Sequence, residues 1–140
     1  MMESFFTIAT LKHYVVALVI FLIIDMMWLT VIAKNLYSKY LGYLMAPNVN
    51  FAAAAIFYLI FIVGLLFFVI DPALRMESLS YALFAGLFFG FVTYATYDLT
   101  NLATVKDWPI TITIIDLIWG SALGAMTSVF SYLLIRVLNW

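Results

Sequence analysis

Residues 11–33 read LKHYVVALVIFLIIDMMWLTVIA, an unbroken run in which most side chains are apolar. A membrane-spanning helix needs about 20 such residues, because the hydrocarbon core is about 30 Å thick and a helix rises about 1.5 Å per residue. This stretch is therefore long enough to cross a bilayer. It nevertheless carries one acid, Asp25, far from either end.

Three further segments have the length and composition of a membrane span, namely residues 51–70, 79–102 and 110–137. Only 9% of the 140 residues are charged and 68% are hydrophobic, whereas a soluble domain carries about 25% charged residues. Lipid is therefore the expected surroundings of most side chains. The sequence predicts an all-α fold with one domain, residues 1–140: a polytopic transmembrane bundle of four antiparallel helices with short loops.

The breaks between the spans contain residues that end or start helices. Pro47 is expected to end the first helical segment, and Asn50 can cap the second. Pro72 is expected to end the second span, since proline lacks an amide hydrogen. Asp107 and Pro109 predict an acidic cap and a proline at the start of the fourth span.

Tyrosines and tryptophans lie near the predicted span ends. Tyr37, Tyr40 and Tyr43 recur every three residues after the first span. This spacing predicts an interfacial extension of the first helix, with its tyrosines in an aromatic belt at headgroup level. Trp108 and Trp140 are assigned to the same kind of belt.

The remaining composition excludes several kinds of site. The chain has no cysteine, which excludes disulfides, thiolate metal sites and thiol catalysis. A single histidine, His13, cannot build a multi-histidine metal site, and its place near a span end argues against heme. The six basic residues form no stripe for nucleic acid. We therefore expect no cofactor, no metal and no nucleic-acid partner.

The basic residues do not fix the orientation in the membrane. Counted by side, they divide into two groups of three: Lys12, Arg75 and Arg136 against Lys34, Lys39 and Lys106. The positive-inside rule therefore gives a tie. Two arrangements stay open: both chain ends in the cytoplasm, or copies inserted in both orientations.

Three aspartates lie inside the spans: Asp25, Asp98 and Asp116. Each costs about 2.5–3.5 kcal/mol near the bilayer centre on insertion scales, so a chain that carries three is expected to use them. Alternating span directions place all three in the same half of the membrane. Asp98 and Asp116 are expected at almost the same depth on consecutive helices. We predict that the three acids meet in one lipid-shielded cavity.

Glycines of the last two spans predict a close helix pair. Both spans carry Gly-x-x-x-Gly, from Gly86 to Gly90 and from Gly120 to Gly124. At 100° per residue, the second pair shares a helical face with Asp116. Small residues let helix backbones approach closely in lipid. The pattern therefore predicts a helix–helix seam that points Asp116 inward.

Aromatic and amide side chains accompany the acids. Trp28 and Trp119 each follow an aspartate by three residues, so their indole N–H groups can donate to a carboxylate or ligand, or the rings can simply pack. The shared Ile-Ile-Asp-x-x-Trp pattern of the first and fourth spans reflects either an inverted repeat, as in small transporters, or chance. The predicted ligand- or proton-binding residues come from three spans: Asp25, Trp28, Tyr94, Tyr97, Asp98, Asn101, Asp116 and Trp119.

Three stretches carry a resemblance to a known family. Residues 97–104, 106–109 and 116–120 read YDLTNLAT, KDWP and DLIWG, and Asp25 with Trp28 fits the same pattern. They resemble a family of small bacterial integral membrane proteins that is known only as a domain of unknown function, and the resemblance covers nearly the whole chain. It implies a four-span protein of the bacterial inner membrane. It implies no substrate.

Three functions stay open. The first is proton- or cation-coupled transport of a small or aromatic, cationic substrate, by a homodimer because four spans are few to enclose a path. The second is a membrane enzyme that acts on a lipid or another apolar substrate through an Asp98–Asp116 acid/base pair. The third is a structural or sensory partner whose acids hold the helices together. The sequence assigns no catalytic residue and does not decide whether the protein is an enzyme.

Overall fold

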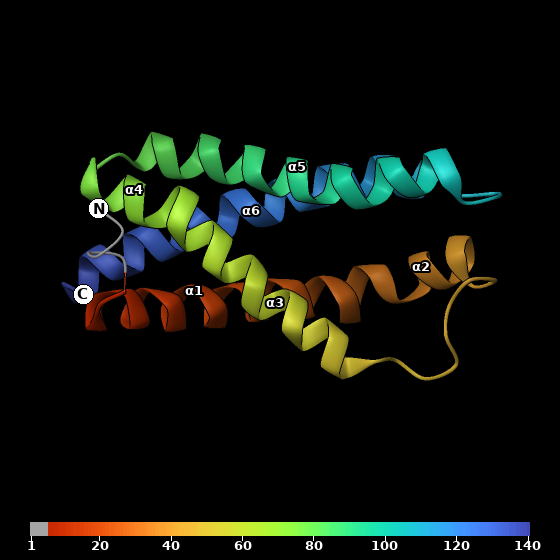
Figure 1. The fold of residues 1–140 in the computed structure, drawn as a ribbon, viewed down its shortest axis with the longest axis horizontal. Coiled ribbons are helices and arrows are strands. Elements are labelled where there is room, and N and C mark those ends of the chain that lie inside the picture. The colour runs from red at the N-terminus through yellow and green to blue at the C-terminus, as the bar shows by residue number, and fades with distance from the viewer. Residues whose placement is uncertain (1–5) are drawn as a thin grey trace.

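A computed structural model describes residues 6–140, in which every regular element is a helix. Four long helices are apolar enough to cross a membrane: Ile8–Leu41, Phe51–Arg75, Leu79–Thr104 and Ile110–Leu138. The predicted all-α class and the four spans are confirmed. In Figure 1 both termini lie at the same end of the bundle, and successive spans change direction along its long axis.

One turn of π-helix interrupts each of the first two long helices. A π-helix bonds each N–H to the fifth residue back, so the turn is wider and holds an extra residue. The first long helix comprises α1 (Ile8–Met27), η1 (Trp28–Ile32) and α2 (Ala33–Leu41). The second comprises α3 (Phe51–Leu65), η2 (Leu66–Ile70) and α4 (Asp71–Arg75). The third and fourth are the uninterrupted helices α5 (Leu79–Thr104) and α6 (Ile110–Leu138).

The helix ends follow the expected capping residues in part. Asn50 caps α3 as predicted, since its side-chain oxygen accepts a hydrogen bond from the Ala53 N–H at 3.1 Å. The second span continues past Pro72, because this proline lies in the first turn of α4, where its missing N–H costs little. The predicted Asp107 cap is wrong: Asp107 has a left-handed backbone (φ 60°), and Pro109 occupies the N-cap of α6.

The glycine seam joins α5 and α6, which share the most extensive contact in the described part of the chain. Gly86, Gly90, Gly120 and Gly124 are all buried. A Cβ atom on Gly86 would lie 2.6 Å from Oγ of Ser128, and one on Gly90 would overlap the Gly120 carbonyl. The predicted seam is confirmed, and the backbones approach too closely for larger residues.

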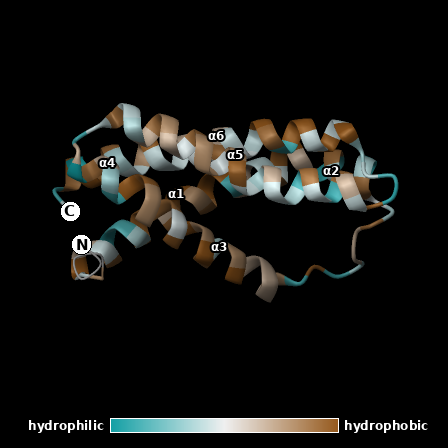
Figure 2. Ribbon diagram, turned by 45° about the horizontal axis from the view of Figure 1, so that its top comes forward, coloured by the Kyte–Doolittle hydropathy of each residue, from teal (hydrophilic) through white to brown (hydrophobic). Residues whose placement is uncertain are grey.

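On its other side, α6 packs against α1 and η2. Phe21, Leu65, Leu66 and Leu123 form the fully buried centre of this core. The start of α3 diverges from α5, whose main contact with the second span is through η2 (Figure 1). In Figure 2 the hydrophilic colours gather mainly in the loops and at the two ends of the bundle, as expected for a chain that spans a membrane.

The tryptophans assigned to an aromatic belt differ in their surroundings. Trp140 is 46% exposed, which suits a belt, but Trp108 is only 8% exposed. The Trp108 indole Nε1 donates to Oγ1 of Thr113 at 3.1 Å, and its ring meets that of Tyr97 edge-on with centroids 5.7 Å apart. The belt assignment of Trp108 is wrong, because the turn before α6 folds this ring inward against α5 and α6.

Candidate functional site

A cavity of about 470 Å³ is lined by residues from all four spans. Its volume lies within the range of about 300–1,000 Å³ that is typical of small-molecule sites. Two carboxylates, those of Asp25 and Asp116, line it, and none of its described lining residues is basic. Aromatic side chains make up most of the remaining wall: Trp28, Tyr37, Phe57, Tyr58, Tyr94, Tyr97 and Trp119.

Asp25 faces the interior of the bundle and is only 4% exposed. The Tyr58 hydroxyl on α3 donates to its Oδ2 atom at 2.8 Å. The Trp119 indole N–H also approaches this carboxylate, but it makes no hydrogen bond of ordinary geometry. The orientation agrees with the insertion cost, since a carboxylate in this span is cheapest where protein groups surround it.

Asp116 receives its hydrogen bond from Tyr37 on α2. The Tyr37 hydroxyl donates to Oδ1 of Asp116 at 2.6 Å, and the Trp28 indole N–H donates to the Tyr37 hydroxyl at 3.4 Å. The Tyr37 hydroxyl therefore points into the bundle, which the spacing of the tyrosines alone does not predict. The wide turn η1 changes the face that α2 presents, which brings Tyr37 inward.

The rings of Trp28 and Trp119 stack on one another. Their centroids lie 4.3 Å apart and their planes differ by 7°. Of the two roles that the spacing left open, packing is the one observed, and neither indole donates to the aspartate three residues before it. The two Ile-Ile-Asp-x-x-Trp segments thus lie against each other, because their tryptophan rings stack. The aspartate of each segment accepts a hydrogen bond from a tyrosine.

Asp98 lies behind Asp116 rather than on the cavity wall. It is fully buried and does not line the cavity. Its carboxyl group lies close enough to that of Asp116 for the two charges to interact, but no described residue forms a hydrogen bond with either of its oxygens. Two carboxylates that lie close together repel each other when both are ionised, so this pair is costly to keep doubly charged.

Six of the eight residues predicted from the sequence line the cavity, and Asp98 and Asn101 do not. The Tyr94 ring reaches the cavity by crossing α6 at Gly120, where a Cβ atom would overlap it. The predicted set omits Tyr37, which donates to Asp116, and Tyr58, which donates to Asp25. No sequence pattern separates these two tyrosines from the other tyrosines of the chain.

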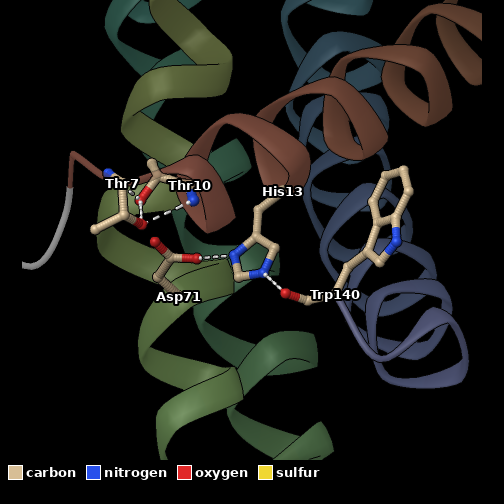
Figure 3. A network of polar contacts seen from close by, with 5 residues as sticks. All are labelled: Thr7, Thr10, His13, Asp71 and Trp140. Atoms are coloured by element: carbon tan, nitrogen blue, oxygen red, sulfur yellow. Dashed lines mark hydrogen bonds and ion pairs between the residues drawn. The ribbon is translucent and has the colours of Figure 1, made fainter.

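A second polar cluster lies at the end of the bundle that holds both termini. His13 contacts Oδ1 of Asp71 through Nδ1 at 2.8 Å and the Trp140 carbonyl oxygen through Nε2 at 3.1 Å (Figure 3). Beside it, Thr7 and Thr10 cap α1 reciprocally. These contacts tie α1 to α4 and to the last residue of the chain.

No curated protein and no solved structure matches this chain. The model of one family, described as "Predicted membrane protein (DUF2177)", matches residues 10–133. The matched part includes the three aspartates of the spans and the stacked tryptophans, and it confirms the resemblance to a membrane protein family of unknown function. The chain therefore belongs to the DUF2177 family of predicted membrane proteins.

Proposed function

We propose that this protein binds a small organic cation in the cavity and exchanges it for protons across a bacterial inner membrane, as a homodimer. The observation that supports this most is the presence of two carboxylates, Asp25 and Asp116, in a cavity whose described lining residues include no base. Surroundings of low dielectric strengthen the attraction between a carboxylate and a bound cation. A singly charged ligand would therefore be favoured over a neutral one.

The aromatic wall suits an organic cation better than a metal ion. Tyr94 and Tyr97 line the cavity, and the stacked Trp28 and Trp119 each keep one face free of the other ring. Aromatic faces attract quaternary and protonated amines through the ring quadrupole. Hard metal ions prefer several oxygen ligands, and the described residues contain no cluster of three or more acids or histidines.

Proton exchange is assigned to the pair of Asp98 and Asp116. A cation bound at Asp116 would offset the repulsion between the two carboxylates, and a proton taken up by the pair would do the same, so the cation and the proton would compete. The cavity would hold either the proton or the cation. This mutual exclusion is what coupled exchange across a membrane requires.

The two alternative functions have less support. An enzyme with an Asp98–Asp116 acid/base pair needs both groups at the substrate, but Asp98 lies outside the cavity lining. A purely structural role would use the bonds from Tyr37 and Tyr58 to the acids. Such bonds within membranes average only about 0.6 kcal/mol, which offsets little of the insertion cost of the acids.

Calorimetric titration of the purified protein with benzyltrimethylammonium tests this function. Asp25→Asn and Asp116→Asn are each expected to weaken binding by at least about tenfold, which corresponds to about 1.4 kcal/mol. Asp107→Asn is the matched control, because Asp107 lies in the turn before α6 and does not line the cavity. Its affinity should stay within about twofold of the original.

Proteoliposomes test the coupling. An imposed pH gradient should drive accumulation of the cation by the original protein and not by Asp116→Asn. Absence of binding, or equal binding by both amide variants and the control, would refute the proposed site. Binding without gradient-driven accumulation would retain the site and refute the exchange.

A further inference from the structure

A second cavity, of about 320 Å³, lies beside the first, between α3 and α5. Phe57, Tyr94 and Tyr97 line both cavities, and Thr93 lines the second. No charged residue is among the described residues that line it. Phe57 is 45% exposed and Tyr97 is 56% exposed, so this groove reaches the outer surface. In Figure 1 the backbones of α3 and α5 diverge.

The two neighbouring cavities, which share Phe57, Tyr94 and Tyr97 in their walls, differ in chemistry. One end carries the carboxylates of Asp25 and Asp116, and the other is an uncharged groove that opens toward the lipid-facing surface. A compact cation would fill only the first cavity. A ligand with a cationic head and an apolar tail would match both.

We propose that the substrate is an amphiphilic organic cation, which places its ammonium head between Asp25 and Asp116 and its apolar tail in the groove between α3 and α5. This inference rests on the proposed function and adds the class of substrate. The groove also provides a route of entry, since the tail can remain in apolar surroundings while the head moves from the bilayer surface to the carboxylates.

Charge complementarity favours this occupant over two others. A zwitterionic phospholipid would bring its phosphate close to Asp25 and Asp116, which would repel it. A helix from a second copy could cover Phe57 and Thr93, but it would leave the two carboxylates without a counter-charge. A cationic amphiphile satisfies the charge and the apolar groove together.

Binding of butyl- and decyltrimethylammonium to the protein in nanodiscs tests the inference. Each methylene group transferred from water to an apolar site strengthens binding by at most about fourfold. The tail also partitions into lipid, so a single dissociation constant is not informative. The quantity to compare between variants is the dissociation constant of the butyl ligand divided by that of the decyl ligand. Thr93→Phe fills the groove and should lower this ratio by at least about tenfold.

Thr96→Phe is the matched control, because Thr96 lies on the same helix, is exposed and lines neither cavity. Its ratio should equal that of the original protein. Equal ratios in both variants would overturn the groove while leaving the cation site intact. Absence of binding of either ligand to the original protein would instead refute the proposed function.

Two further measurements separate the other occupants and do not depend on how Thr93→Phe folds. A decyl chain that ends in a photoreactive diazirine should label Phe57, Thr93 or Tyr97, and label found only elsewhere would overturn the inference. Dodecylphosphocholine should not compete with the decyl cation. Competition by it would assign the groove to lipid and overturn the inference.

Discussion

The hydroxyl groups of Tyr37 and Tyr58 hold the two cavity carboxylates, at 2.6 Å from Asp116 and 2.8 Å from Asp25. Replacing either tyrosine by phenylalanine removes one interhelical hydrogen bond and leaves a buried carboxylate without its donor. We expect each variant to lower the free energy of unfolding by about 0.6–1.7 kcal/mol, measured by equilibrium unfolding in mixed detergent micelles.

Tyr40→Phe is the control for this pair of substitutions. Tyr40 lies on the same helix as Tyr37 and contacts Lys39 through its ring rather than a carboxylate through its hydroxyl. Its stability should change by less than about 0.5 kcal/mol. Equal losses in all three variants would show that the hydroxyl–carboxylate bonds contribute nothing specific.

Gly120 fixes the position of the Tyr94 ring, because a Cβ atom there would overlap that ring. Gly120→Ala is therefore expected to cost about 1–3 kcal/mol in unfolding free energy through overpacking, and it should also weaken cation binding by moving Tyr94. Gly64→Ala offers a control, since its Cβ would meet only the far end of the Phe89 ring at 2.9 Å, which can move. A Gly120→Ala protein with unchanged stability and affinity would contradict the close packing of Tyr94.

The sequence predicts that the acids of the spans turn inward and that the glycines pack against a neighbouring helix, but it does not predict the hydrogen-bond partners of the acids or the place of Asp98 outside the cavity lining. Asp25 and Asp116 stand out because a carboxylate in hydrocarbon is costly, and Gly120 stands out through its spacing from Gly124. Tyrosine is common at membrane interfaces for several reasons. Its presence at Tyr37 therefore carried no information about a contact with an aspartate of another span.

At the scale of elements, the π-turn η1 sets the direction in which α2 presents its side chains. The extra residue in this turn rotates everything after it by about 100° relative to a continuous α-helix. Deleting Val31, which is 77% exposed and packs little, should restore a regular helix and turn Tyr37 away from Asp116. We expect helical circular dichroism to stay constant while cation affinity falls at least about tenfold.

Deletion of Val49 is the control for this change. Val49 is 61% exposed and lies in the loop before α3, where no helical register depends on it. Its deletion should leave affinity within about twofold. If both deletions behave alike, loss of affinity reflects general damage and not the rotation of α2.

The spans themselves were predictable, because hydropathy over about 20 residues reflects a simple transfer energy. The two π-turns were not, since a widened turn costs local hydrogen-bond geometry and persists only where tertiary contacts favour it. Pro72 is an example. From the sequence alone this proline is expected to end a helix, but in the structure it lies in the first turn of α4, which follows η2 and carries the second span to Arg75. The positions of the helices follow from composition, whereas their rotation depends on contacts between distant segments.

At the scale of the whole molecule, the two ends of the bundle differ. At the end that holds both termini, His13 links α1 to Asp71 at the start of α4 and to the last residue, Trp140 (Figure 3). Toward the other end, the backbones of α3 and α5 diverge (Figure 1), and residues of these two helices line both the cavity with the carboxylates and the groove beside it. The cluster around His13 is therefore expected to hold the helices together while the opposite end admits a ligand.

Asp71→Ala tests this role of the cluster around His13. The side chains of His13 and Asp71 are only 13% and 10% exposed. Removing the Asp71 carboxylate therefore leaves the His13 ring nitrogen without this partner in a place that water reaches poorly. We expect a loss of about 1–3 kcal/mol in unfolding free energy. Cation affinity should remain within about twofold, because Asp71 does not line the cavity.

Glu77→Ala is the matched control at the same end of the bundle. Glu77 pairs with Arg136 at 3.5 Å, but these side chains are 76% and 46% exposed, and an exposed ion pair contributes only about 0–1 kcal/mol. Asp71→Ala should therefore lower stability clearly more than Glu77→Ala in the same unfolding measurement. Equal effects would mean that the contact between His13 and Asp71 contributes no more than a solvated surface pair. The end of the bundle that holds both termini would then owe its stability to the glycine seam and the apolar core alone.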